Sequence, residues 1–151
     1  MAIRASRELV IDAPPETIID TLADVAALPL WSPAHSEVAL IDTYVDGRPH
    51  HVAVTVQLMG IVDREVLEYQ WGRDWVIWDA KRTRAQHGQH VEFRLSPEAG
   101  KTRVRFDITL EPNSLLPDFL LKRPRETVLA SVVDGLPAQV AAHGRTNSSD
   151  A

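Results

Sequence analysis

Hydrophobic and polar residues alternate with a period of two through the middle of the chain. In residues 50–59, for example, Val52, Val54 and Val56 share one face. Phe93 and Phe106 occupy the corresponding apolar positions of two later segments. Such alternation is typical of antiparallel strands with one buried face and one solvated face. The pattern predicts strands over 3–12, 37–45, 50–59, 60–71, 75–84, 90–97 and 102–112, with turns at 46–49, 72–74, 86–89 and 98–101.

Near both ends of the chain, apolar residues recur every three or four positions, as on one face of a helix. The first such segment, 12–25, opens with Asp12, a candidate N-cap, and contains two prolines suited to a first helical turn. The proline-broken segment 27–33 predicts a second, short helical turn that ends near Trp31.

A long C-terminal helix is predicted over 116–144. Its apolar stripe consists of Leu129, Val133, Leu136 and Val140, widened by Val128 and Val132. Gly144 is a plausible C-cap. Pro124 and Pro137 each lack the backbone N–H that a helix interior needs, so we expect kinks near both or a helix that begins at Pro124.

This order of elements predicts an α+β fold. A curved antiparallel sheet of about seven strands would wrap around the C-terminal helix, with two short helices after the first strand. A helix held by a strongly curved sheet leaves a concave apolar space, which is the usual form of a ligand pocket. We expect one domain over 1–143 and a small, polar, disordered tail over 144–151.

Composition narrows the possible functions. The chain has 151 residues, of which 44% are hydrophobic and 25% charged, as expected for a soluble globular domain. Its formal net charge of -5 disfavours binding to nucleic acids or anionic lipid surfaces. No apolar run is long enough to span a membrane, and the lack of cysteine excludes disulfides and thiol nucleophiles. A cytoplasmic protein without a cofactor is expected, and its oligomeric state is left open.

Several short segments resemble a known superfamily through their order and spacing. They are IDAPPETIIDTLADVAALPLWSP, DGRP, DREVLEYQW, VIW, TRVRFDITLEP and LPDFLLKR. Over residues 5–143 the chain resembles the SRPBCC (START-like, helix-grip) superfamily, especially its polyketide cyclase/dehydrase-like branch of actinobacterial type. The resemblance implies a helix-grip fold with a cavity for lipids, sterols, polyketides or other apolar molecules. It says little about chemistry, because one fold hosts many functions.

The candidate ligand-binding residues lie on the face expected to be buried. Within residues 71–78, a period of two turns Trp78 toward this face and Trp75 toward the wetter one, and leaves Trp71 undecided. The full set is Trp31, Tyr44, Val54, Val56, Leu67, Tyr69, Trp78, Phe93, Phe106, Val132 and Leu136. Ordinary core packing is an equally good interpretation of these residues.

Two weak catalytic candidates stand out, His35 and Asp63. His35 follows a turn at the expected cavity mouth, where an imidazole can act as an acid or base, although a surface or capping role is favoured. Asp63 and Glu65 share a strand face with Leu67. On an inner face, desolvation would raise a carboxyl pKa and make a general acid, but a solvated position at the strand end is favoured.

No metal site is predicted. His50 and His51 are adjacent in a strand and should point to opposite faces, and the chain has no zinc-binding motif.

Three functions remain open. The first is binding or transport of a hydrophobic small molecule, favoured by the inferred cavity. The second is an enzyme of the cyclase, aromatase or dehydratase type, because such chemistry needs little beyond a shaped cavity and one acid or base. The third is a protein-interaction module, for which an exposed apolar patch around Trp75 and Ile77 would be evidence.

Overall fold

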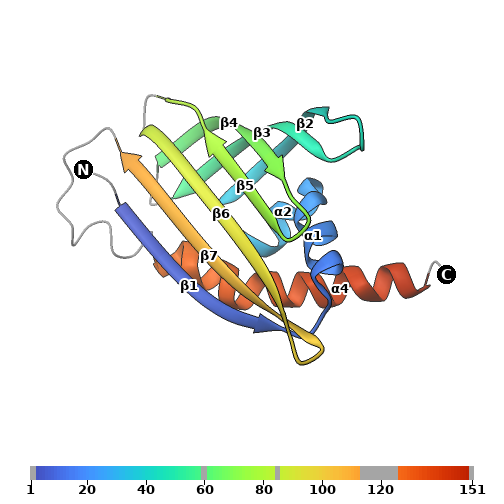
Figure 1. The fold of residues 1–151 in the computed structure, drawn as a ribbon. Coiled ribbons are helices and arrows are strands. Elements are labelled where there is room, and N and C mark those ends of the chain that lie inside the picture. The colour runs from blue at the N-terminus through green and yellow to red at the C-terminus, as the bar shows by residue number, and fades with distance from the viewer. Residues whose placement is uncertain (1–2, 59–60, 84–85, 113–125, 150–151) are drawn as a thin grey trace.

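The computed structural model describes residues 3–58, 61–83, 86–112 and 126–149. One antiparallel sheet of seven strands, in the order β1-β7-β6-β5-β4-β3-β2, curves over the helices (Figure 1). The strands are β1 Ile3–Ile11, β2 His35–Thr43, β3 Pro49–Leu58, β4 Ile61–Trp71, β5 Trp75–Ala80, β6 Gln86–Glu98 and β7 Lys101–Pro112. The helices are α1 Pro15–Ala23, the 3₁₀ turn Val25–Ala27, α2 Leu28–Trp31, the π-helical turn Ser131–Gly135 and α4 Leu136–Ser149. The predicted fold is confirmed.

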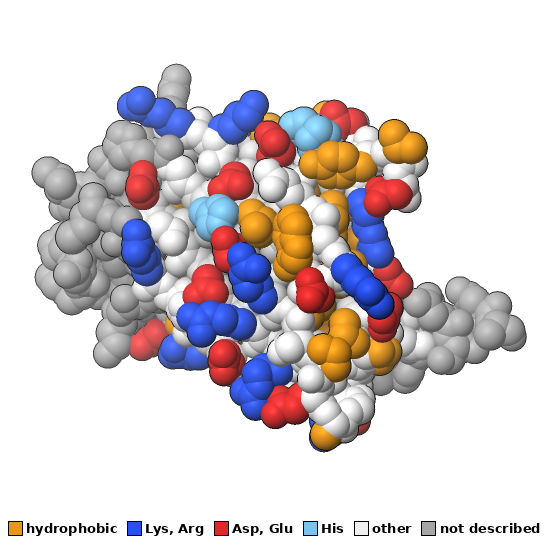
Figure 2. Space-filling view, in the orientation of Figure 1, with side chains coloured by type: hydrophobic (Ala, Val, Ile, Leu, Met, Phe, Trp, Pro, Cys, Tyr) orange, Lys and Arg blue, Asp and Glu red, His pale blue; other side chains and the backbone are white. Residues whose placement is uncertain are grey.

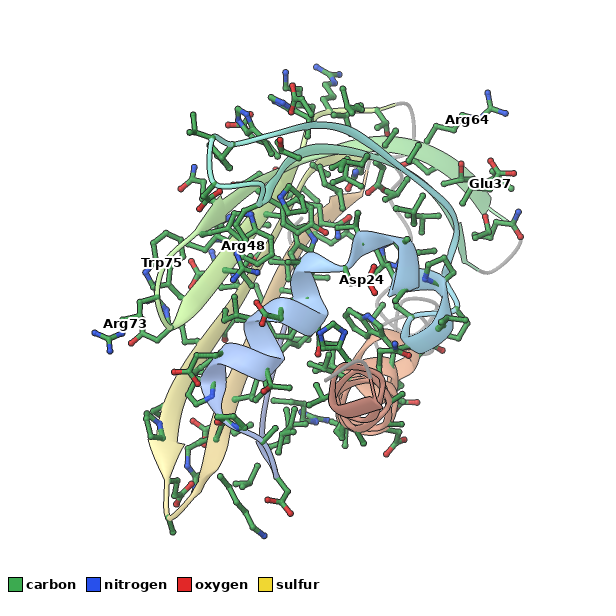
Figure 3. All side chains as sticks on the ribbon, turned by 90° about the vertical axis from the view of Figure 1, so that its right-hand side faces the viewer. Asp24, Glu37, Arg48, Arg64, Arg73 and Trp75 are labelled. Atoms are coloured by element: carbon green, nitrogen blue, oxygen red, sulfur yellow. The ribbon has the colours of Figure 1, made fainter. Side chains whose placement is uncertain are left out.

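The core lies between the concave face of the sheet and the helices. Its members alternate along each strand, as Val52 and Val54 do on β3, and recur at helical spacing as Leu136 and Val140 do on α4. Figure 3 shows the sheet arching over α1 and α4. Full burial of an aliphatic side chain of this size stabilises the fold by about 1.5–3 kcal/mol.

The convex face of the sheet is charged, as the alternation of β7 predicts. Arg103 binds Glu8 and Glu98 at N–O distances of 3.3 and 2.9 Å, and Arg105 binds Asp107 at 3.0 Å. Figure 2 shows basic and acidic side chains interspersed over this face. Among the described residues, no helix combines the length and apolar character needed to cross a bilayer.

Two local predictions at the strand and helix ends are wrong. The predicted turn at 86–89 belongs to β6, because a register shift between Gln86 and Gly88 absorbs the glycine as an irregularity in the strand. The α1 helix has Pro14 rather than Asp12 at its N-cap, with no side-chain cap. Pro15 supplies the first helical φ angle, so the helix begins without a side-chain cap. The hairpin turn at 46–49 is confirmed, with Gly47 at φ +89°.

The C-terminal helix changes its winding before Pro137. Residues 126–130 are α-helical, and the five residues Ser131–Gly135 form a π-helical turn. Pro137 has no N–H to donate to the preceding turn, and the wider π turn accommodates that loss. The wider turn also shifts the helical phase, so Val132 is buried while Val133 is 38% exposed, contrary to the predicted stripe. The predicted kink at Pro124 lies outside the described residues.

The close approach of this helix to α2 depends on Gly135. A Cβ atom at that position would lie 2.3 Å from the carbonyl oxygen of Trp31. Further along, α4 continues through Gly144 to Ser149, so the predicted C-cap at Gly144 is wrong. A glycine inside a helix costs about 1 kcal/mol relative to alanine, which is too little to end it.

Candidate functional site

Ten of the eleven predicted ligand-binding residues lie in the interior between the sheet and the helices. Trp31, Val54, Leu67, Tyr69, Trp78, Phe93, Phe106, Val132 and Leu136 belong to one buried cluster, and Val56 packs against it. The eleventh, Tyr44, lies elsewhere and is described below. Alternation along the strands is the cause of this convergence, because every second side chain points to the same face.

A band of aromatic rings crosses the concave face through four neighbouring strands. Tyr69 of β4 contacts Trp78 of β5, with ring centroids 5.0 Å apart. Trp78 contacts Phe93 of β6 at 5.4 Å, and Phe93 contacts Phe106 of β7 at 5.0 Å. The tilted rings have the geometry that aromatic pairs prefer. The band belongs to the buried cluster between the sheet and the helices.

Polar atoms are also buried, on Trp78 of the band and farther along β4 and β6. Glu65 is 6% exposed and Gln86 is 3% exposed. Among the buried side-chain atoms of the described residues, Glu65 Oε1, Trp78 Nε1 and both amide atoms of Gln86 have no hydrogen-bond partner. Such atoms are rare in folded proteins, in which the large majority of buried polar groups are paired. They mark a place where an interior guest, water or ligand, would find hydrogen bonds.

These groups gather where β4 and β6 begin. Thr83 donates its hydroxyl to Asp63 Oδ2 at 2.9 Å, and its backbone N–H donates to the carbonyl oxygen of Gln86 at 3.0 Å. Thr83 therefore ties the strand that carries Asp63 and Glu65 to the strand that carries Gln86.

Glu65 is the buried carboxyl that the sequence analysis expected to be solvated. It lies opposite Val54 in the middle of the sheet, so its side chain has no route along a strand end to water. Burial, a hydrogen bond with neighbouring Asp63 and the charge of that group together raise its pKa to about 8. Glu65 is therefore mostly protonated at neutral pH and can donate a hydrogen bond. Asp63 is half-buried.

His35 lies on the same face as Asp63. It is paired with Val56, and Val56 is paired with Asp63, so the two candidates occupy one row across β2, β3 and β4. Two strand spacings separate their backbones by roughly 10 Å. The Nδ1 atom of His35 lies 2.9 Å from the hydroxyl of Ser32. Burial lowers its pKa to about 4 against an opposing hydrogen bond with the Ser32 backbone, so the ring is neutral at pH 7.

We call His35, Asp63, Glu65, Thr83 and Gln86 the polar end of the interior. The residue pattern indicates His35 and the carboxyls on β4. Gln86 falls in a predicted turn and Thr83 in a longer predicted strand, so the pattern does not indicate either of them. Trp78 was correctly assigned to the interior face.

Tyr44 lines an external groove instead. The groove has a volume of about 670 Å³ and is lined by Tyr44, Val45, Asp46, Gln70, Trp71 and Trp75. The Tyr44 hydroxyl donates to the carbonyl of Tyr69 at 2.6 Å, and Trp71 Nε1 donates to the carbonyl of Pro49 at 2.7 Å. The Arg48 guanidinium lies 5.5 Å from the Trp71 ring centroid and pairs with Asp20 of α1. Trp75 is half-buried, as expected for the wetter face.

The prediction that His50 and His51 point apart is wrong. Strict alternation fails here because the register between β2 and β3 shifts on both sides of Asp42. Asp42 opposes His51 and Thr43 opposes Pro49, which leaves His50 as an extra residue in a bulge. As a result, ligand-type atoms of Asp42, His50 and His51 lie within 4.8 Å of one another.

Solved structures with the same fold come from several bacteria. A START superfamily protein of Mycobacterium smegmatis superimposes with a TM-score of 0.81 at 20% identity, covering 92% of this chain and 97% of the other. An aromatase/cyclase, ZhuI, from a Streptomyces species gives 0.75 at 16% identity, covering 96% and 95%. A Thermus thermophilus protein gives 0.74 at 20% identity, covering 94% and 98%. At these identities the likeness establishes the fold alone.

A comparison with curated protein sequences finds no significant match. The sequence does match the family described as "Polyketide cyclase / dehydrase and lipid transport", and the match extends over residues 2–143. Because it spans nearly the whole chain and the fold agrees, the protein belongs to the polyketide cyclase/dehydrase and lipid transport family.

Proposed function

We propose that the protein binds a largely apolar small molecule in the interior between the concave sheet and α4, with an oxygen- or nitrogen-bearing group of the ligand directed at the polar end. The observation that carries this proposal is the set of unpartnered buried atoms, on Trp78 of the aromatic band and on Glu65 and Gln86 of the polar end. Family membership is consistent with it.

The energetics favour a ligand that is largely apolar and also carries a hydrogen-bonding group. An unsatisfied buried polar group costs about 1–3 kcal/mol, so hydrogen bonds from a ligand to these atoms recover energy that the fold alone does not. The aromatic band supplies apolar contact at about 25 cal/mol per Å² of surface removed from water. Protonated Glu65 and the Trp78 indole are donors, and the Gln86 amide is both donor and acceptor.

Native mass spectrometry and thermal-shift assays on delipidated protein test the proposal, with a panel of sterols, fatty acids and aromatic polyketides. A ligand at about 100 times its Kd should raise the Tm by about 5–10 °C. Trp78→Phe removes the buried N–H and should weaken binding of oxygenated members of the panel. Trp75→Phe, on the outer face of the same strand, is the matched control. The absence of any shift across the panel would contradict the proposal.

A second candidate is catalysis of dehydration in the same interior, supported by the opposite protonation of two groups on one face. Protonated Glu65 is a potential acid and neutral His35 a potential base. In a β-hydroxy ketone, His35 would take the proton from the α-carbon while Glu65 donates its proton to the departing hydroxyl. The products are an enone and water, and proton exchange with solvent restores both residues.

Turnover of a β-hydroxy ketone by the wild type and by Glu65→Gln separates catalysis from binding. If the protein is an enzyme, Glu65→Gln should retain ligand affinity and lose turnover by about 100-fold or more. Equal turnover in both proteins would show that Glu65 is not the acid, and no turnover in the wild type would leave binding as the function.

A further inference from the structure

We propose that Asp42, His50 and His51 form a binding site for a divalent transition-metal ion of the Zn²⁺ class, at the edge of the sheet and independent of the interior. His51 Nδ1 lies 2.9 Å from Asp42 Oδ1 and 3.2 Å from Oδ2. His50 Nδ1 lies 3.8 Å from Asp42 Oδ1. Neighbouring ligand atoms in a tetrahedral zinc site are separated by about 3.3 Å, given bonds of about 2.0 Å. The observed separations bracket that value.

The backbone holds the two imidazoles on the same side. As the bulged residue of β3, His50 departs from the alternation that would turn it away from His51. Their ring centroids are 4.0 Å apart. The hairpin that carries them is closed by backbone hydrogen bonds between Tyr44 and Arg48 and between Gly47 and Tyr44. The arrangement is therefore built into the β2–β3 connection and does not depend on a chance pair of surface rotamers.

Further contacts orient each metal-ligating side chain on the side away from the proposed ion. His51 Nε2 lies 3.6 Å from Glu68 Oε2, which is the outer carboxylate that metal-bound histidines commonly have. His50 stacks on Tyr44 at 4.2 Å between centroids, and Tyr44 is itself held by its hydrogen bond to the carbonyl of Tyr69. The backbone N–H of His51 donates to Asp42 Oδ1 at 2.9 Å. Metal binding at Nδ1 of a neutral His51 would leave the single ring proton on Nε2, where it is directed at Glu68.

Charge and accessibility favour a cation here. Asp42 lies beside both histidines and Glu68 lies beside His51, and the guanidinium of Arg48 is directed instead at Asp20 and Trp71. The side chains of His50 and His51 are 30% and 25% exposed, so an ion can reach them from solvent. Two imidazoles with one carboxylate suit Zn²⁺, Ni²⁺ or Cu²⁺ better than Mg²⁺ or Ca²⁺, and three protein ligands leave a coordination position for water.

Calorimetric titration of the tag-free, full-length protein with Zn²⁺ tests the proposal, with Mg²⁺ as the selectivity control. We expect one Zn²⁺ per chain and no Mg²⁺ binding at the same concentrations. His50→Ala and Asp42→Asn should each weaken Zn²⁺ binding by at least about tenfold, and Glu68→Gln by a smaller factor.

His90→Ala is the matched control variant. Its Nδ1 pairs with Asp79 at 2.5 Å and its Nε2 with Glu92 at 2.8 Å, so the carboxylates lie on opposite edges of one ring and cannot share an ion with it. This variant should bind Zn²⁺ like the wild type. The proposal would be overturned if the wild type does not bind Zn²⁺ or if binding survives His50→Ala. Equal losses of Zn²⁺ affinity in His50→Ala and His90→Ala would also overturn it.

A second measurement protects against misfolding of the variants. Co²⁺ added to the wild type should give the visible absorption of a tetrahedral centre, and Zn²⁺ should abolish it by competition. Failure to see either change would also overturn the site. Circular dichroism of each variant checks that the sheet is intact.

Discussion

Replacement of Glu65 by glutamine tests whether this carboxyl is buried and protonated. Glutamine has nearly the same shape and keeps a hydrogen-bonding head, but it cannot ionise. The pKa of Glu65 is raised from 4.5 to about 8, mainly by burial. Between these values, the folded protein holds a proton that the unfolded chain has released.

The size of the effect follows from linkage between protonation and folding. The wild-type free energy of unfolding should fall by about 1.4 kcal/mol per pH unit from pH 4.5 upward and level off above pH 8. Over the full interval the loss is about 5 kcal/mol. Because the folded pKa is the higher one, this stability is present at low pH and lost as pH rises. Glu65→Gln lacks the titration and should become progressively more stable than the wild type over the same interval.

Urea unfolding of both proteins, followed by tryptophan fluorescence at pH 5, 6, 7, 8 and 9, measures the difference directly. Contributions from titrating groups remote from Glu65 are common to both proteins and cancel in the comparison. A difference in unfolding free energy that stays constant from pH 5 to 9 would refute a buried, protonated Glu65. A difference that widens as pH falls would show that the ionised form is the one stabilised by the fold.

Further substitutions test the packing and the second titrating group. Gly135→Ala should destabilise the protein by about 1–3 kcal/mol in urea unfolding, because its Cβ would meet the Trp31 carbonyl. Gly144→Ala has open space around it and should be neutral or stabilising by up to about 1 kcal/mol. Equal effects of the two substitutions would contradict the close approach at Gly135. The pKa of His35 is lowered from 6.5 to about 4, so its contribution to the free energy of unfolding is complete above pH 6.5 and is lost as pH falls toward 4. In the same assay, the wild type should lose about 3 kcal/mol relative to His35→Gln over this interval. Parallel pH profiles of the two proteins would contradict this. Phe93→Ala should cost about 3–5 kcal/mol, and a loss below 1 kcal/mol would show that the aromatic band is loosely packed.

Most of the fold could be predicted because the strands alternate cleanly. Val52 and Val54 on β3, or Val104 and Phe106 on β7, leave one choice of inner face, and the positions of the interior residues follow from it. The helical spacing of Leu136 and Val140 similarly determined the face that α4 buries. These are properties of long, regular elements, in which each residue supports the same assignment.

The polar end and the histidine cluster were hidden for a different reason. A one-residue irregularity reverses the face of every following side chain in a strand. The residue types at Leu40 to Thr43 do not predict such an irregularity. The bulge therefore brought His50 to His51, and the shift at Gly88 turned an expected turn into a strand that buries Gln86. Glu65 is buried and not solvated because the neighbouring strands separate it from water. The periodicity of β4 alone gives no information about how those strands cover it.

The irregular register of β2 also bears on the solubility of the protein. An open sheet has two edges, and β2 forms one of them, with Leu40 and Ile41 about half exposed. A straight apolar edge of this kind invites strands of other molecules to add to the sheet. The shifts on both sides of Asp42 interrupt the row of backbone groups that an incoming strand would need, and they place a charge at the interruption. The distortion that brings two histidines together therefore also discourages the sheet from growing into an aggregate.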